Sequence, residues 1–181
     1  TNSPETPATA GLTVEHRDRW LLARFAEDHD VLSWAIIGGG ARQTRTVAWY
    51  QVSKGDLPVH LDAQKFLRQR LQKISAPDAV GLLTERSLEA FVDVEKRYGE
   101  VSARCIATVG LSNALRVGEP PDPEHRAGTI NLLCRVSAPL SEEGLVEAVA
   151  IAAEARALAV LESGVVSLSS ALPATRTGTD C

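Results

Sequence analysis

Three short segments of the chain join glycine to hydroxyl, amide or carboxylate side chains. They read GLSNA at residues 110–114, GTIN at 128–131 and TRTGTDC at 175–181. Glycine lets backbone N–H groups approach a ligand closely, and short polar side chains present hydrogen-bond donors and acceptors at little rotamer cost. Each segment borders an apolar run typical of a strand or helix. The pattern therefore predicts a polar binding pocket.

The third segment contains the first candidate for proton transfer, Asp180. It is the one carboxylate embedded in a Gly/Thr turn, and the charge nearest to it in that segment is Arg176, four residues earlier. A carboxylate in this setting could act as a general acid or base. The alternative is a turn aspartate that hydrogen-bonds its own backbone.

Asn113 and Asn131 are candidates for binding an amide group or a developing oxyanion, because a side-chain amide offers both donors and an acceptor. The alternative for each is a capping role in a loop or helix. The hydroxyl residues could be nucleophiles only beside a base, and no spacing in the sequence establishes such a pair. We expect the following residues to line the pocket: Ser112, Thr129, Thr177, Gly178 and Thr179.

A run of glycines, Gly38, Gly39 and Gly40, follows the apolar residues 31–37. It lacks the register and the lysine of a phosphate-binding loop, and residues 44–50 after it have the pattern of a strand and not of the required helix. We expect it to offer backbone donors to a ligand, with a tight turn or bulge as the alternative.

The cysteines and tryptophans are expected to be mainly structural. Cys105 and Cys134 lie inside apolar runs, where a free thiol behaves as a small buried hydrophobic group. Cys181 adjoins the polar glycine turn and is a weaker candidate nucleophile. Of the three tryptophans we expect at most one to serve as a stacking surface. No set of residues has the spacing of metal ligands, and Asp28-His29-Asp30 is predicted to be a solvated turn.

Composition sets limits on partners. The chain has 181 residues and a net charge of −4, with a pI near 5.6 and basic residues spread along it. This distribution argues against nucleic acid as a partner. No apolar run has the length of a membrane span, so we expect a soluble, cytoplasmic protein without a membrane partner. A homo-oligomer remains open.

Periodicity predicts the elements that would position these residues. Two helices are expected, one capped by Asp62 and extending to about residue 74, the other capped by Ser141 and covering 142–162. A loop is expected at 116–128 and a hairpin turn at 98–100. Strands are expected at 20–25, 31–37, 44–52, 79–84, 88–96, 101–109, 129–137 and 165–172.

These elements predict an α+β fold, in which a largely antiparallel or mixed sheet packs with two long helices. Short connections between the first strands favour antiparallel neighbours. We expect residues 1–10 to form a flexible N-terminal tail and residues 11–181 to form a single domain.

The chain resembles the adenosylcobinamide amidohydrolase (CbiZ) family, enzymes of corrinoid salvage. The resemblance extends through LSWAIIGGGARQTRTVAWYQV (32–52), VGLLTE (80–85), ATVGLSNALRVGEP (107–120), residues 127–162 and ATRTGTDC (174–181). Two features depart from the family. Arg176 stands where the family usually has a small residue, and the chain stops at Cys181 where relatives continue into another apolar strand, so the C-terminal end of the domain is expected to be truncated.

The resemblance implies hydrolysis of the amide that links the corrin propionyl side chain to aminopropanol in adenosylcobinamide or a related cobamide, giving adenosylcobyric acid. The partner would then be an adenosylated corrinoid, whose cobalt belongs to the substrate, and whose amide-rich rim would bind Asn113, Asn131 and the glycine turns. His60 matches a recurring family position and is the second catalytic candidate, with a surface histidine as the alternative. Hydrolysis requires no organic cofactor, and an assisting metal is left open.

Two other functions remain open. One is a corrinoid carrier or sensor that binds without cutting. The other is a self-processing hydrolase in which Thr177, Thr179 or Cys181 becomes a terminal nucleophile.

Overall fold

Four strands form the first sheet, in the order β1–β2–β3–β4. The computed structural model describes residues 11–53, 55–58, 60–120 and 128–178 of the chain, so the expected tail at 1–10 lies outside it. The strands are β1 (Leu12–Arg17), β2 (Trp20–Ser33), β3 (Gly40–Gln51) and β4 (Val80–Thr84). The first three are antiparallel, whereas β4 runs parallel to β3. The helix α1 (Ala63–Lys73) lies in the connection that such a parallel pair requires.

β2 corrects two predictions. It is one strand of 14 residues, and not two strands separated by a solvated turn at Asp28-His29-Asp30. The pairing register with β3 shifts between Arg24 and His29, which marks a bulge that absorbs the polar residues within the strand. Asp28 then pairs with Arg45, whose Nε lies 2.9 Å from Oδ1, and Asp30 accepts a hydrogen bond from Gln43 at 3.0 Å.

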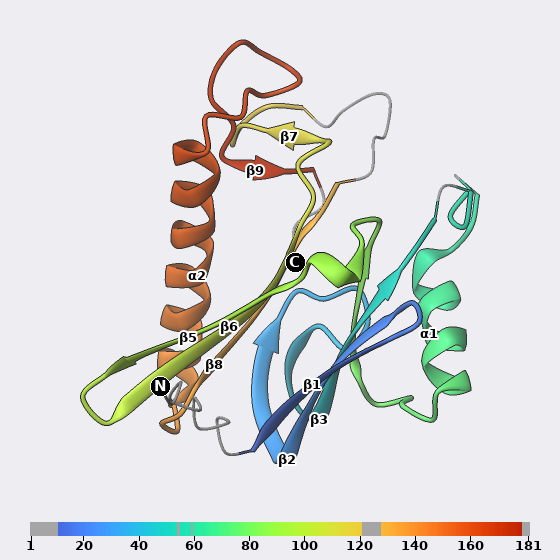
Figure 1. The fold of residues 1–181 in the computed structure, drawn as a ribbon, viewed down its shortest axis with the longest axis vertical. Helices are drawn as coiled ribbons and strands as arrows, with labels where there is room; N and C mark the ends of the chain where they lie inside the picture. The colour runs from blue at the N-terminus through green and yellow to red at the C-terminus, as the bar shows by residue number, and fades with distance from the viewer. Residues whose placement is uncertain (1–10, 54, 59, 121–127, 179–181) are drawn as a thin grey trace, which may run out of the picture.

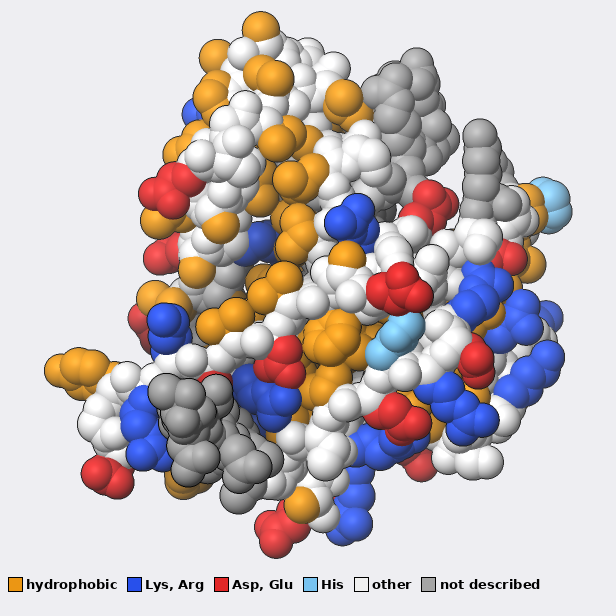
Figure 2. Space-filling view, in the orientation of Figure 1, with side chains coloured by type: hydrophobic (Ala, Val, Ile, Leu, Met, Phe, Trp, Pro, Cys, Tyr) orange, Lys and Arg blue, Asp and Glu red, His pale blue; other side chains and the backbone are white. Residues whose placement is uncertain are grey.

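α1 begins where the sequence predicted. The Asp62 side chain accepts a hydrogen bond from the backbone N–H of Lys65 at 3.0 Å, which satisfies one free donor of the first turn. The helix buries Phe66, Leu67 and Leu71 against one face of the first sheet, where Tyr50 is among the buried residues. Its exposed positions are lysine, arginine and glutamine, and Figure 2 shows basic side chains gathered over this side of the molecule.

The second sheet has three antiparallel strands in the order β5–β6–β8, namely β5 (Val92–Tyr98), β6 (Val101–Val109) and β8 (Ile130–Val136). The predicted turn joins β5 to β6, with Gly99 at a φ of 57°. The predicted strand at 88–96 starts later than expected, because Ser87 caps a short 3-10 helix, η1 (Leu88–Ala90), through the N–H of Glu89.

The two sheets pack face to face. Leu21, Trp49 and Leu82 of the first sheet form one hydrophobic cluster with Ile106 of β6, and Leu133 of β8 packs against it. The expected α+β fold with two long helices and a mixed sheet is confirmed. Figure 1 shows α1 and α2 on opposite sides of the molecule, with the sheets between them.

The second long helix, α2 (Glu142–Glu162), also has the predicted bounds. The Ser141 hydroxyl accepts a hydrogen bond from Gly144 N at 3.2 Å. Along this fully described helix Val160 is the one buried residue, and it packs near Ile130. Because apolar residues occupy every side of α2, one sheet face covers few of them, and Figure 2 shows hydrophobic side chains exposed over it. None of the described helices combines the length and apolarity needed to cross a membrane.

Two very short strands, β7 (Ala114–Leu115) and β9 (Arg176–Thr177), form a third sheet that the sequence did not predict. The predicted strand at 165–172 is wrong, since the segment makes only an isolated bridge between Val166 and Pro173. Its backbone bonds elsewhere, and Leu168 N donates to Ala114 O at 2.9 Å. The segment therefore holds β7 in place and does not extend a sheet.

Candidate functional site

Asn113 lies between two glycines from distant parts of the chain. A Cβ atom on Gly128 would lie 2.6 Å from Asn113 Oδ1, and one on Gly178 would lie 3.1 Å from Asn113 Nδ2. The distance at Gly128 leaves no room for a side chain, and the distance at Gly178 is tighter than most real Cβ contacts. The three segments singled out in the sequence therefore meet around this asparagine.

Backbone hydrogen bonds hold the segments together. Gly110 N donates to Thr129 O at 3.0 Å, and the pairing of Ala114 with Thr177 joins β7 to β9. We call this group the Asn113 cluster. It consists of Gly110, Ser112, Asn113, Gly128, Thr129, Thr177 and Gly178.

The cluster has an inner and an outer part. Asn113 is 3% exposed and Thr177 is fully buried. Ser112 is exposed, and Thr129 and Gly178 are half-buried. A ligand approaching from solvent would thus meet the hydroxyl groups and the glycine backbone first, with the Asn113 amide beneath them.

Asn131 joins the two large sheets beside this cluster. It is fully buried, and its Nδ2 donates to the carbonyl oxygen of Leu83 in β4 at 2.8 Å. That bond fixes the orientation of the side-chain amide. Directly opposite in β6 lies Thr108, which is also fully buried.

Three buried oxygens in this region have no hydrogen-bond partner among the described residues. They are Asn113 Oδ1, Asn131 Oδ1 and Thr108 Oγ1. An unsatisfied buried polar atom costs about 1–3 kcal/mol, and native structures contain few of them. Their grouping is typical of a site that accepts hydrogen bonds from a ligand or from ordered water. Thr108 was missed in the sequence, where only its position opposite Asn131 in paired strands could have revealed it.

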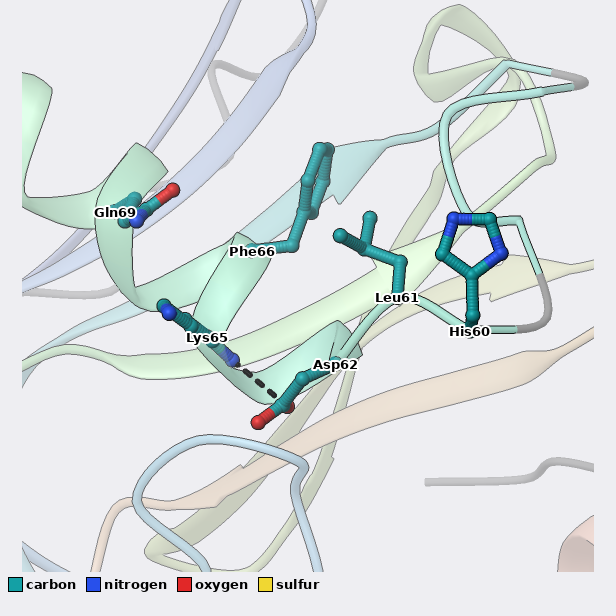
Figure 3. Close-up of a pocket in the computed structure, with 6 residues that line it drawn as sticks. All are labelled: His60, Leu61, Asp62, Lys65, Phe66 and Gln69. Carbon is teal, nitrogen blue, oxygen red and sulfur yellow. Dashed lines mark hydrogen bonds between the residues drawn. The ribbon is translucent and has the colours of Figure 1, made fainter.

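The structure does not bring His60 into this cluster. His60 is exposed and lines a pocket of about 350 Å³ at the start of α1, together with Leu61, Asp62, Lys65, Phe66 and Gln69. Figure 3 shows His60 and Gln69 at opposite ends of this row, and Asp62 turned back toward Lys65. No member of the Asn113 cluster lines the pocket.

The glycine run lies at another place. Gly38 and Gly40 have φ values of 71° and 89°, and a Cβ on Gly39 would lie 2.7 Å from Ala35 O. These conformations meet the needs of a tight turn between β2 and β3. A Cβ on Gly38 would lie 3.5 Å from Ala79 O, just before β4, whereas Asn131 reaches Leu83 near the end of β4.

The remaining predicted residues are accounted for as follows. Thr179, Asp180 and Cys181 lie outside the described residues. Trp20 and Trp49 are buried, while Trp34 is 48% exposed. Within the described residues, no group of three or more His, Cys, Asp or Glu side chains is placed to hold a metal ion.

Glu119 joins the segments next to β7, and no pattern in the sequence marks it as a candidate. Its carboxylate accepts hydrogen bonds from the hydroxyls of Ser167 and Ser170 and from the backbone N–H of Arg116. These donors favour the charged form and lower the pKa of Glu119. The carboxylate thus ties the segment after β7 to the segment after α2.

The two described cysteines correct another prediction. Cys134 is exposed and Cys105 is half-buried, so the expected burial is wrong for Cys134. Val92 and Val94 on β5 are exposed as well, and Val94 is the direct pairing partner of Cys105. The hydrogen bond between the two sulfurs lowers the pKa of Cys134 to about 7 and raises that of Cys105.

Comparisons with known proteins agree on one family. A family model described as adenosylcobinamide amidohydrolase matches residues 5–181. A curated relative from Methanosarcina mazei, named adenosylcobinamide amidohydrolase, is 31% identical over 138 residues. That alignment covers 76% of this chain and 62% of the relative, so the chain spans about three fifths of the relative's length. No solved structure matches the chain significantly.

Proposed function

Because the chain belongs to the adenosylcobinamide amidohydrolase family, we propose that it hydrolyses the amide between the corrin propionyl side chain and aminopropanol. The substrate would be adenosylcobinamide or a related cobamide, and the product adenosylcobyric acid. The reaction would serve corrinoid salvage and remodelling in the cytoplasm. The observation that carries the proposal is the meeting of three glycine-rich segments around Asn113.

Amide hydrolysis sets three chemical demands. Water or a side chain must be activated as the nucleophile, donors must stabilise the oxyanion, and an acid must protonate the departing amine. The outer part of the Asn113 cluster suits the second demand, since Ser112 carries a hydroxyl at the surface and the half-buried Gly178 lies against Asn113. Glycine at this position allows a bulky ligand to come close to the main chain.

Asn113 and Asn131 would act beneath this surface. The Asn113 side chain packs against both Gly128 and Gly178, so it sets the spacing of the backbone that meets the substrate. Its unpartnered carbonyl oxygen is an acceptor for the N–H of a carboxamide arm. Asn131 has the same free acceptor and is held by Leu83.

Proton transfer is assigned to Asp180, which follows Gly178 by two positions in the sequence. The described residues of the cluster contain no carboxylate, and the carboxylate of Glu119 is engaged by two serine hydroxyls. His60 remains the second candidate, on the separate pocket at the start of α1. We propose that hydrolysis uses no organic cofactor, and activity measured before and after chelator treatment tests for an assisting metal.

The decisive experiment is incubation of the chain with adenosylcobinamide, followed by chromatography for adenosylcobyric acid. Appearance of the acid supports the proposal. Binding of the corrinoid without product after prolonged incubation would instead assign the chain as a carrier or sensor. Intact mass before and after the reaction separates a self-processing hydrolase, which would be shortened, from an enzyme that acts with its chain uncut.

A further inference from the structure

Cys105 and Cys134 form a close thiol pair outside the proposed active site. They are direct partners in the antiparallel pairing of β6 with β8, and their sulfur atoms lie 3.6 Å apart. Directly opposed residues in antiparallel strands have Cα atoms about 4.5–5.5 Å apart, which falls inside the range of about 4.4–6.8 Å found for disulfides. A bond between the two sulfurs therefore requires side-chain rotation and no movement of the strands.

The two thiols differ in a way that gives each a separate role. Cys134 is exposed, so a small reagent can reach it, whereas Cys105 is half-buried. The hydrogen bond with Cys105 lowers the pKa of Cys134 to about 7, so a large fraction of Cys134 is thiolate at neutral pH. The pKa of Cys105 is raised by the same hydrogen bond, by burial, and by the negative charges of Cys134 and Asp93.

We propose that Cys105 and Cys134 are a dithiol site for low-molecular-weight disulfides of the glutathione class, which convert the pair into a disulfide between β6 and β8. Cys134 is the attacking residue. Its thiolate breaks the S–S bond of the reagent, forms a mixed disulfide and releases one thiolate, which takes a proton from water. Cys105 then loses its proton and attacks Cys134 Sγ, and the second reagent thiolate leaves. Counted from the state in which both cysteines are protonated, the protein loses two electrons and two protons, which reduce the reagent disulfide to two thiols.

The position of this bond gives it a structural consequence. Residues 106–133 lie between the two cysteines and include Thr108, Asn131 and all but two members of the Asn113 cluster. Oxidation would close this stretch into a covalent loop. The modification would thus fix the relative position of the two strands that lead into and out of the cluster.

The test uses the full chain in a Cys181→Ser background, so that the third cysteine does not react. The reduced protein is incubated with oxidised glutathione, trapped with iodoacetamide and analysed by peptide mass spectrometry. The expected product is a peptide cross-linked between Cys105 and Cys134. In the added Cys105→Ser variant, glutathione should accumulate on Cys134. In the matched Cys134→Ser variant, Cys105 should react more slowly than Cys134 by a factor of about ten or more.

Two results would overturn the inference. One is a stable glutathione adduct on Cys134 while Cys105 is present, since an available partner thiol should displace it. The other is equal reactivity of the two single thiols in folded variants. The cross-link between Cys105 and Cys134 is measured in the Cys181→Ser protein, which keeps both cysteines. The test therefore remains valid even if one of the single variants does not fold.

Discussion

Replacing Gly128 with alanine tests the central contact of the proposed site. The added Cβ would lie 2.6 Å from Asn113 Oδ1 and 2.9 Å from both Asn113 N and Ser112 Oγ. Real Cβ contacts essentially never fall below 3.0 Å. The Asn113 side chain and the Ser112 hydroxyl could rotate away, but a backbone nitrogen cannot, so one of the two segments must shift.

The expected cost follows from overpacking. Inserting a methyl group where neighbours cannot yield costs about 1–3 kcal/mol. For a chain of this size, a loss of about 2 kcal/mol lowers the midpoint of thermal unfolding by about 4–8 °C. Because the shifted segments carry the surface proposed to meet the substrate, turnover of adenosylcobinamide should fall by about ten- to a hundredfold.

Gly144→Ala is the matched control. Gly144 lies in the first turn of α2, where a Cβ would meet Leu140 Cβ at 3.4 Å, an ordinary contact. Alanine in a helix should be neutral or stabilising by up to about 1 kcal/mol. A Gly128→Ala protein that matched the Gly144→Ala control in both unfolding free energy and turnover would refute the close packing around Asn113.

A double variant sharpens the result. Asn113→Ala removes the oxygen at 2.6 Å but leaves the backbone nitrogen at 2.9 Å. Combining it with Gly128→Ala should therefore cost less than the sum of the single changes, with a coupling of about 0.5–3 kcal/mol measured by denaturant unfolding. Strict additivity would mean that the two residues do not touch.

Four further outcomes are expected. Asp180→Ala should greatly reduce turnover without changing the far-ultraviolet circular dichroism, and near-normal turnover would remove Asp180 from the mechanism. Asn131→Ala should lower the unfolding free energy by about 1–3 kcal/mol, because the Leu83 carbonyl loses its donor, and an unchanged denaturation midpoint would contradict that. The pKa of Glu119 lies below its ordinary value of 4.5, so its carboxylate stabilises the fold fully above pH 4.5, and this stabilisation is lost as the pH falls through the lower pKa of the folded state. The thermal midpoint of the native chain should therefore exceed that of Glu119→Gln at pH 7, and the two midpoints should converge in acid. Oxidation of Cys105 and Cys134 by glutathione disulfide closes a loop worth about 3.5 kcal/mol and should raise the thermal midpoint by about 7–14 °C, an effect that a reducing agent reverses. An unchanged midpoint would mean that the bond does not restrain the segment between the cysteines.

Features set by neighbouring residues could be predicted from the sequence. Asp62 and Ser141 predict where the two helices start, because a capping side chain needs only the backbone N–H group three residues later as its hydrogen-bond donor. Gly99 predicts the turn between β5 and β6, because the turn itself requires a positive φ at that residue. The meeting of three glycine-rich segments was also expected, since short polar residues beside glycine have little use in a packed core.

Features set by distant partners could not be predicted. The continuity of β2 depends on a bulge that opposes β3, and an isolated sequence shows only a polar interruption at residues 28–30. The segment 165–172 has the composition of a strand. In the structure the hydroxyls of Ser167 and Ser170 donate hydrogen bonds to the Glu119 carboxylate, and the segment forms a loop. Thr108 resembles any threonine in a strand until the register of β6 and β8 sets it opposite Asn131.

The same register explains why the proposed site lies where it does. Asn131 and Thr108 occupy the face of the second sheet that packs on the first, and Asn131 is anchored to the carbonyl of Leu83. Two residues earlier, Thr129 accepts the hydrogen bond from Gly110 that begins the Asn113 cluster. The position of the cluster is thus set by the contact between the sheets. A change that loosens the sheets, such as the loss of the Asn131 amide, should therefore weaken substrate binding as well as stability.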